Sequence, residues 1–305
     1  MVDLSTRVGS LELANPVMTA SGTAGHGLEL APFVDLAGLG AHVVKSLAAF
    51  EWPGNAAPRL HPAGRGMINA VGLQGPGVVA WLGTDAPRLA AAGVATVVSI
   101  WGRTVDDYRR AAELLADAPS AVIAVEINLS CPNLDGRRGI FAHDPSLSAQ
   151  VVAATAACAR PRWAKLSPNT DRVVEVAEAV RGAGADAVTL SNTMLGLVLD
   201  PTTRRPVLGA GGGGYSGSPI HAIAVRTVYD VHAALPEVPI IGVGGISSGW
   251  DAIELMLAGA AAVQVGTASF ADPAATGRIL GEVRTWCRDQ AVASVAELVG
   301  AAHPR

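Results

Sequence analysis

The sequence is poor in cysteine and has no cluster of positive charge. Its 305 residues include only three cysteines, Cys131, Cys158 and Cys287, which are odd in number and far apart. This spacing excludes a disulfide framework and does not match a zinc knuckle or a four-cysteine iron–sulfur site. The net charge is −4, and no basic run is long enough to follow a phosphate backbone. We therefore expect no metal centre and no nucleic-acid partner.

Long hydrophobic runs are also missing. No uninterrupted apolar stretch reaches the roughly 18 residues that suggest a membrane-spanning helix, and the first residues lack a basic region followed by an apolar segment. Hydrophobic residues nevertheless make up 50% of the chain, so a large core can be buried. These features predict a globular, soluble, cytoplasmic protein with no membrane partner.

The sequence does contain a regular alternation of short apolar runs and longer segments of helical character. Eight apolar runs predict strands at 17–20, 42–45, 96–100, 122–128, 163–167, 187–191, 239–243 and 262–266. Helices are expected at 105–116, 146–160, 171–183, 218–234 and 250–258, with Thr104, Asp144 and Thr170 at helix entries. Eight strand–helix units favour a closed (β/α)8 TIM barrel, and such barrels reach this length as one domain. We predict a single domain over residues 1–305.

Two insertions rich in Gly and Pro interrupt this alternation. Residues 48–77 follow the second predicted strand, and residues 194–217 follow the sixth. In a barrel, such long loops lie at the carboxyl ends of the strands, where active sites are found. The four glycines at 211–214 allow two interpretations, a mobile hinge or a loop that presents backbone amides to an anion.

Polar residues and glycines gather where the predicted strands end. The strand ends carry Ala20, Ser21, Gly22, Lys45, Ser46, Asn128, Lys165, Ser191, Asn192, Thr193, Gly244, Gly245, Gly266 and Thr267. Lysines and asparagines without a carboxylate pair or a histidine cluster argue against a glycosidase or a metal hydrolase. Glycines after the last strands are typical of a phosphate site in a barrel, although turn glycines are common enough to leave both interpretations open.

The histidines carry no pattern of this kind. Lone histidines are usually surface or satisfied core groups. We therefore assign no catalytic role to His26, His42, His61, His143 or His221.

Cys131 is the strongest catalytic candidate. A lone cysteine is more often a buried structural residue, but this one lies between Asn128 and Asn133 just after a predicted strand. Its thiolate can accept a proton, and the flanking amides can pair with a planar polar ligand. Lys165 would place a charge in the same mouth, where it needs an anion, whereas a surface salt bridge is the alternative interpretation.

Together these motifs resemble dihydroorotate dehydrogenase. The resemblance rests on Asn-Ala-Val-Gly-Leu-Gln at 69–74, Asn-Leu-Ser-Cys-Pro-Asn at 128–133, Lys-Leu-Ser-Pro at 165–168 and the glycines near 244 and 266, and it covers essentially the whole chain. It implies an FMN-binding barrel that oxidises dihydroorotate to orotate in pyrimidine biosynthesis. It also implies that Cys131 is the general base, which removes a proton from C5 while a hydride passes from C6 to N5 of the flavin.

The resemblance further implies which residues hold each ligand. The implied substrate residues are Lys45, Asn69, Gly72, Leu73, Asn128, Asn133, Asn192 and Thr193. The implied FMN residues are Ala20, Ser21, Gly22, Lys45, Ser46, Ser99, Asn128, Lys165, Ser191, Gly217, Gly244, Gly245, Gly266 and Thr267. Orotate is a flat anion with an imide edge, which suits amide side chains and a balancing lysine.

The cysteine base resembles the soluble class 1 enzymes, and the segment at 199–217 resembles their B type more than the fumarate-reducing A type. The B type implies a homodimer joined by a second subunit that carries FAD and a [2Fe–2S] cluster and reduces NAD. Gly75 and Ser99 depart from the pattern, since the family usually has asparagine at the first position and the B type commonly has it at the second. An A-type enzyme, a related FMN barrel for another dihydropyrimidine and a non-catalytic flavin-binding paralogue remain alternatives.

Overall fold

A computed structural model of the chain describes residues 2–130 and 140–304. Its centre is one sheet of eight parallel strands. In spatial order these are β3 (Val17–Thr19), β14 (Ala260–Val265), β13 (Ile240–Val243), β10 (Ala187–Leu190), β9 (Arg162–Lys165), β8 (Val122–Asn128), β7 (Thr96–Ile100) and β4 (His42–Val43). A parallel bridge between Met18 and Ala41 joins the two ends of this order and closes the barrel. The predicted (β/α)8 barrel is confirmed, with one strand in each predicted run.

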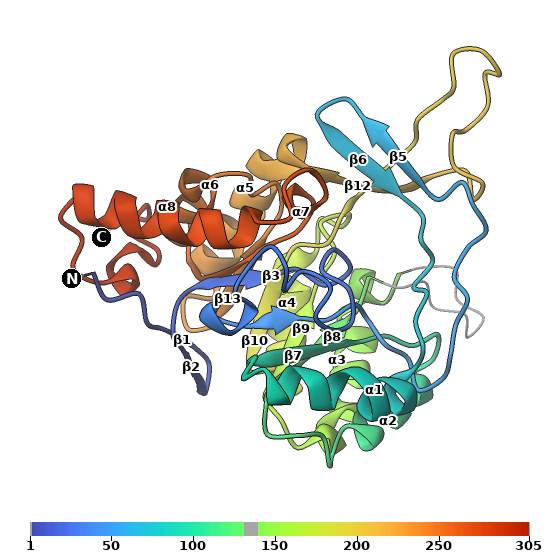
Figure 1. Cartoon of the computed structure of the whole chain (residues 1–305), viewed down its shortest axis with the longest axis horizontal. Coiled ribbons are helices and arrows are strands. Elements are labelled where there is room, and N and C mark those ends of the chain that lie inside the picture. Colours follow the sequence, from blue (N-terminus) through green and yellow to red (C-terminus); the bar gives the residue numbers. More distant parts are fainter. Residues whose placement is uncertain (1, 131–139, 305) are drawn as a thin grey trace.

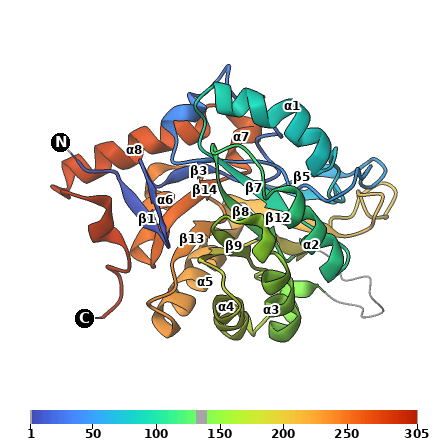
Figure 2. The same ribbon diagram turned by 90° about the horizontal axis from the view of Figure 1, so that it is seen from below.

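Helices surround the strands (Figures 1 and 2). They are α1 (Val78–Ala91), α2 (Val105–Leu114), α3 (Pro145–Ala154), α4 (Val173–Gly182), α5 (His221–Ala234), α6 (Gly249–Leu257), α7 (Ala268–Ala271) and α8 (Ala275–Asp289). Short 3-10 turns lie at Leu36–Gly38, Phe141–His143, Ala156–Cys158, Ser218–Ile220 and Val295–Leu298. The five predicted helices are present, although the second, expected at 146–160, ends at Ala154 and is followed by the turn at Ala156–Cys158. None of the described helices is long and apolar enough to cross a membrane.

Two of the three predicted helix entries are confirmed. Thr104 accepts a hydrogen bond from the Asp107 amide at the start of α2, and Asp144 accepts one from the Leu147 amide at the start of α3. The prediction for Thr170 is wrong, because α4 begins two residues later than expected. Thr170 instead accepts a hydrogen bond from the Arg172 amide at 3.2 Å, in the turn before the helix.

The two insertions fold together into an antiparallel sheet, which we call the mouth sheet. Its order is β11 (Met194–Gly196), β12 (Gly213–Gly217), β6 (Gly66–Asn69) and β5 (Leu60–Ala63). Gly213 and Gly214 are therefore strand residues, so neither proposed role of the glycine run, hinge or anion loop, applies to them. A Cβ atom on Gly214 would overlap the Thr193 side chain, which explains the glycine there. Figure 1 shows the mouth sheet standing clear of the helical ring.

The lower part of the barrel interior is apolar, and we call it the barrel floor. It is a single cluster of buried side chains closed by the N-terminal hairpin of β1 (Thr6–Val8) and β2 (Leu11–Leu13). The cluster includes Val8, Leu13, Met18, Ala41, Val43, Val97, Ala124, Trp163, Ala187, Ile241, Ala261 and Ala262. A larger apolar cluster contains buried side chains of both the strands and the surrounding helices. The strands are therefore packed against apolar side chains on their inner face, at the barrel floor, and on their outer face.

Candidate active site

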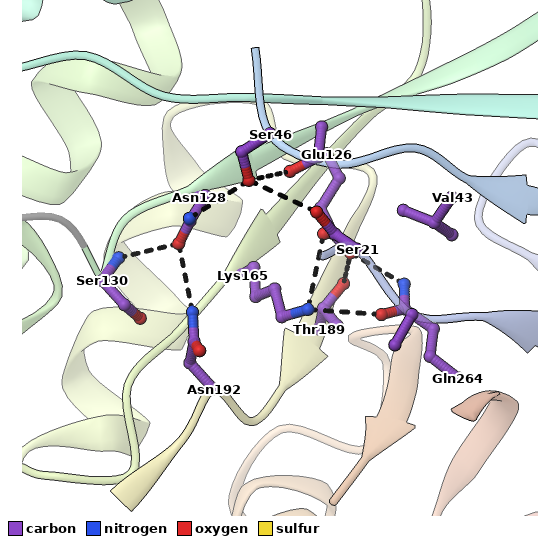
Figure 3. A network of polar contacts seen from close by, with 12 residues as sticks. Ser21, Val43, Ser46, Glu126, Asn128, Ser130, Lys165, Thr189, Asn192 and Gln264 are labelled. Carbon is purple, nitrogen blue, oxygen red and sulfur yellow. Dashed lines mark hydrogen bonds and ion pairs between the residues drawn. The ribbon is translucent and has the colours of Figure 1, made fainter. Parts of the chain in front are cut away.

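A layer of polar side chains lies directly above the barrel floor, and we call it the polar layer. It comprises Glu126 on β8, Lys165 on β9, Thr189 on β10 and Gln264 on β14 (Figure 3). Side chains two residues apart on a strand point to the same face, so each of these follows a floor residue on its own strand. Four strands therefore supply one continuous polar cluster inside the barrel.

Glu126 is the centre of the polar layer. Its carboxylate is fully buried and accepts hydrogen bonds from Gln264 Nε2 at 2.7 Å and Thr189 Oγ1 at 3.2 Å. Its other oxygen lies 3.6 Å from Lys165 Nζ. Glu126 was not among the residues predicted from the sequence, although the alternation Ala124, Glu126, Asn128 on a buried strand is a signal that points to it.

Lys165 is buried and paired, so the surface salt bridge considered from the sequence is wrong. Only 6% of the residue is exposed, and its ammonium contacts Gln264 Oε1 at 3.4 Å and Glu126 at 3.6 Å. Both contacts are longer than the 2.7–2.9 Å typical of charge-assisted hydrogen bonds. The ammonium therefore has donor capacity for a further acceptor at the mouth.

Above the polar layer, amide and hydroxyl groups from several strand ends form one network (Figure 3). Asn128 Nδ2 donates to Ser46 Oγ at 3.3 Å, and Asn192 Nδ2 donates to Asn128 Oδ1 at 3.1 Å. The hydroxyl of Ser46 also lies 2.9 Å from that of Ser99 and 3.3 Å from that of Ser21. Five predicted ligand-binding residues, each from a different strand or strand end, are thus brought together in one hydrogen-bond network.

Lys45 adds a second positive charge near this network. It follows β4, and its backbone amide donates to Gly25 O at 2.9 Å. Its ammonium lies near Gly22, where a Cβ atom on the glycine would be 3.8 Å from Lys45 Nζ. Burial and the Lys45 charge together lower the pKa of the nearby His26. His26 is therefore a neutral neighbour near neutral pH, and the cationic side chain here is Lys45.

The mouth sheet positions most of the remaining predicted substrate residues. Asn69 ends β6 and donates to Gly214 O at 3.2 Å, and Thr193 packs against Gly214. Gly72 and Leu73 follow in the left-handed region, with φ of 74° and 62°. A non-glycine residue held there is strained, which is typical of backbone fixed for a functional reason.

Glycine turns line another part of the mouth, at the ends of β12, β13 and β14. Gly217, Gly244 and Gly245 have φ of 96°, 141° and 71°. A Cβ on Gly245 would lie 2.6 Å from His221 Cβ, and one on Gly244 would lie 2.6 Å from Ala224 Cβ, so no larger residue fits either turn. Backbone amides in glycine turns of this kind suit a phosphate group.

The β14 end joins this region to the mouth sheet. Thr267 Oγ1 donates to Ser216 Oγ at 2.8 Å, and a Cβ on Gly266 would lie 3.2 Å from Ala20 Cβ. Ser191 also lies at the mouth, where its amide donates to Val243 O at 2.9 Å. The structure thus places all described members of the predicted set at one end of the barrel.

Four positions remain to be placed: two predicted site residues, and the two positions at which the sequence differs from the family pattern. Cys131 and Asn133 lie outside the described residues. Ser99, where an asparagine was expected, is buried within the hydroxyl network. Gly75 forms a two-way backbone bridge with Trp52, with hydrogen bonds of 2.9 and 3.0 Å.

Comparison with known proteins gives one consistent result. The family model for dihydroorotate dehydrogenase matches residues 3–286. The chain is 45% identical over 300 residues to "Dihydroorotate dehydrogenase B (NAD(+)), catalytic subunit" of Pelobacter propionicus, covering 98% of both chains. Proteins of the same name from Desulforudis audaxviator and Geobacter sulfurreducens are 45% and 44% identical, over 99% and 98% of this chain and 98% of each relative.

Proposed function

The chain belongs to the dihydroorotate dehydrogenase family, and from that premise we propose that it is the catalytic subunit of a B-type, NAD-linked enzyme. It is an oxidoreductase that converts dihydroorotate to orotate in pyrimidine biosynthesis. The observation that carries this function is the near full-length match to catalytic subunits of that name. The amide network at the barrel mouth supports it independently.

The substrate is held by amides and a lysine. Asn128 and Asn192 share one hydrogen bond, which fixes the two amide groups relative to each other, and their remaining donor and acceptor atoms suit the imide edge of the ring. Lys45 balances the substrate carboxylate, and Asn69, Gly72, Leu73 and Thr193 contact the ring from the mouth sheet and the segments next to it. Asn133 completes this proposed set.

FMN fits the residues on the opposite part of the mouth. The turns at Gly217, Gly244, Gly245 and Gly266, with Thr267, offer backbone amides to its phosphate, and the positive φ of the first three favours glycine there. Ala20, Ser21, Gly22, Ser46, Ser99 and Ser191 lie at the ends of neighbouring strands. Lys165 supplies a positive charge where negative charge develops on reduction. When bound, FMN supplies the acceptor for the hydride that leaves the substrate.

Cys131 is the proposed general base. It accepts the proton from C5 of dihydroorotate while the hydride leaves C6, so that a C=C bond forms between these carbons. A thiol has an ordinary pKa of about 8.5, so reduction of the flavin should accelerate as the pH rises toward that value. A reduction rate that is flat with pH in stopped-flow measurements would contradict this role.

The assembly is also a proposal. The name of the relatives, a catalytic subunit, supports a second subunit. We infer a homodimer joined by a partner subunit that carries FAD and a [2Fe–2S] cluster. The cluster is assigned to the partner because the cysteine spacing of this chain is unsuited to ligating it.

The direct test is anaerobic reduction by dihydroorotate. The purified protein should be yellow and should bleach on addition of substrate, and Cys131→Ala should slow bleaching by a factor of at least 100. Cys158→Ala removes a buried thiol far along the chain and serves as the control, with bleaching at the parent rate. A colourless protein that refuses added FMN, or full turnover by Cys131→Ala, would overturn the proposal.

Reoxidation then identifies the electron acceptor. The reduced protein should pass electrons to NAD only when the FAD and [2Fe–2S] partner is present, and it should react slowly with fumarate and quinone. Rapid reoxidation by fumarate without a partner would instead identify an A-type enzyme.

A further inference from the structure

Three metal-binding side chains meet outside the active site, between the start of α5 and one face of α6. His221 is the first residue of α5, and Asp251 and Glu254 are one turn apart on α6. His221 Nε2 lies 3.1 Å from Glu254 Oε2 and 3.9 Å from Asp251 Oδ1. One ligand atom from each residue lies within 4.8 Å of the other two.

The orientation of the imidazole is fixed from its other side. His221 Nδ1 lies 2.9 Å from the carbonyl oxygen of Gly244, which can only accept, so Nδ1 carries a hydrogen. In the neutral ring, Nε2 then presents a lone pair to two carboxylates that are themselves acceptors. A second proton or a metal cation resolves this conflict. A backbone carbonyl on the distal nitrogen is also the usual support of a metal-binding histidine.

Asp251 is held ready as an anion. Its Oδ2 accepts hydrogen bonds of 2.7–2.9 Å from the Ser247 amide, the Ser247 hydroxyl and the Ser248 amide, which leaves Oδ1 facing His221. Burial opposes its charge, but these hydrogen bonds and the nearby His221 outweigh it and lower the pKa of Asp251. Glu254 is more exposed, and its side chain has the freedom to adjust.

We propose that His221, Asp251 and Glu254 form a binding site for a divalent transition-metal ion of the zinc type, with water as the fourth ligand. Zinc bonds of 2.0–2.2 Å place tetrahedral ligand atoms about 3.3 Å apart. The observed separations of 3.1 and 3.9 Å from His221 Nε2 bracket this value, and the three ligand atoms, all within 4.8 Å of one another, would close around the ion by side-chain movement. An imidazole with two carboxylates favours zinc over magnesium, which prefers oxygen ligands alone.

The site would act on the glycine turn that we propose holds the FMN phosphate. His221 is bonded to the Gly244 carbonyl, and its Cβ fills the space beside Gly245. A metal ion would therefore fix β13, α5 and α6 to one another beneath this turn. No metal site was expected from the sequence, because His221 stands 30 residues from Asp251 and only the barrel brings them together.

The site can be tested by zinc titration of the flavin-loaded protein. Calorimetry with Zn²⁺ would use tag-free, EDTA-treated protein in the Cys131→Ala background, so that this thiol does not compete. We expect one zinc ion per chain, at least tenfold weaker binding in Glu254→Gln, and loss of binding in His221→Gln. His61→Gln, which changes a partly exposed histidine on β5, should bind zinc like its parent.

Thermal unfolding gives a second readout that does not depend on activity. Zinc should raise the unfolding temperature of the parent, and at the same zinc concentration it should raise that of Glu254→Gln by less. Because this glutamate is partly exposed, the variant should fold even if His221→Gln does not. Zinc binding that is unchanged in Glu254→Gln, no binding at all, or equal competition by Mg²⁺ would overturn the proposal.

Discussion

The barrel floor and the polar layer are built from the same strands and differ in everything else. On four strands, one step of two residues separates them: Ala124 and Glu126, Trp163 and Lys165, Ala187 and Thr189, Ala262 and Gln264. Below the step, buried apolar surface stabilises the fold. Above it, the strands bury an ion pair, which is weak evidence for stability. Position along the strand therefore separates the part that holds the barrel from the part that serves the ligands.

The largest expected effect comes from unpairing the polar layer. Lys165→Met leaves Glu126 as a buried charge without a cation, and the free energy of unfolding should fall by about 3–5 kcal/mol. The double variant Lys165→Met with Glu126→Leu makes this layer resemble the floor and should regain most of that loss. Urea unfolding of the flavin-free proteins measures both. Equal losses in the single and double variants would show that the pair is not the source.

A somewhat smaller effect comes from His42, a polar residue buried in the wall and bonded to Thr19 Oγ1 at 3.1 Å. Burial lowers its pKa from 6.5 to about 4. The folded protein keeps His42 neutral, whereas the unfolded chain binds a proton below pH 6.5. The free energy of unfolding should therefore be about 3 kcal/mol lower near pH 4 than above pH 6.5 because of this one residue. The loss begins as the pH falls below 6.5 and is complete below the folded-state pKa.

His42→Asn removes this titration. The variant's free energy of unfolding should decrease less steeply between pH 6.5 and 4 than that of the parent, as measured by urea unfolding at each pH. Parallel acid branches in the two proteins would contradict the assignment.

At the mouth, activity and stability should separate. Asn192→Ala removes the hydrogen bond to Asn128 and a proposed substrate contact, so KM for dihydroorotate should rise about tenfold, equivalent to about 1.4 kcal/mol. The free energy of unfolding should change by less than about 1 kcal/mol, because the residue is partly exposed. Steady-state kinetics and urea unfolding give the two values. If the variant is destabilised but has a normal KM, Asn192 stabilises the fold and does not bind the substrate.

The smallest effect should come from a substitution in the barrel floor, which should change stability and leave activity unchanged. Ile241→Val removes one buried methylene group and should lower the free energy of unfolding by about 1 kcal/mol. The rate of flavin reduction and KM should match the parent, since the residue lies below the polar layer. A change in reduction rate would show that the two levels are mechanically coupled.

The strands and most helices could be predicted because their signals are local. Each barrel strand is a short apolar run, and all eight were located to within a few residues. The helices α1 and α8 were not predicted, because Gly83, Pro87, Gly277 and Gly281 interrupt their patterns. The mouth sheet was taken for loops, since β12 is mostly glycine and becomes a strand only by pairing with β6.

The site shows the same division. Residues at strand ends, such as Asn128 and Lys165, were predicted because parallel strands bring their carboxyl ends to one place. The alternation on β8 marks Glu126 as an inward-facing residue, but it gives no sign of a partner 39 residues away, so the ion pair with Lys165 could not be predicted. The meeting of His221 with α6 likewise depends on the packing of two helices.

The mouth sheet sets a rule for recombining this protein with its relatives. Ile68 from the first insertion pairs with Tyr215 from the second, and Asn69 pairs with Gly214. In a chimera that takes the two segments from different parents, β6 and β12 would have to pair in this register although their sequences come from different proteins. Exchanges that aim to alter substrate choice should therefore transfer residues 48–77 and 194–217 as one cassette.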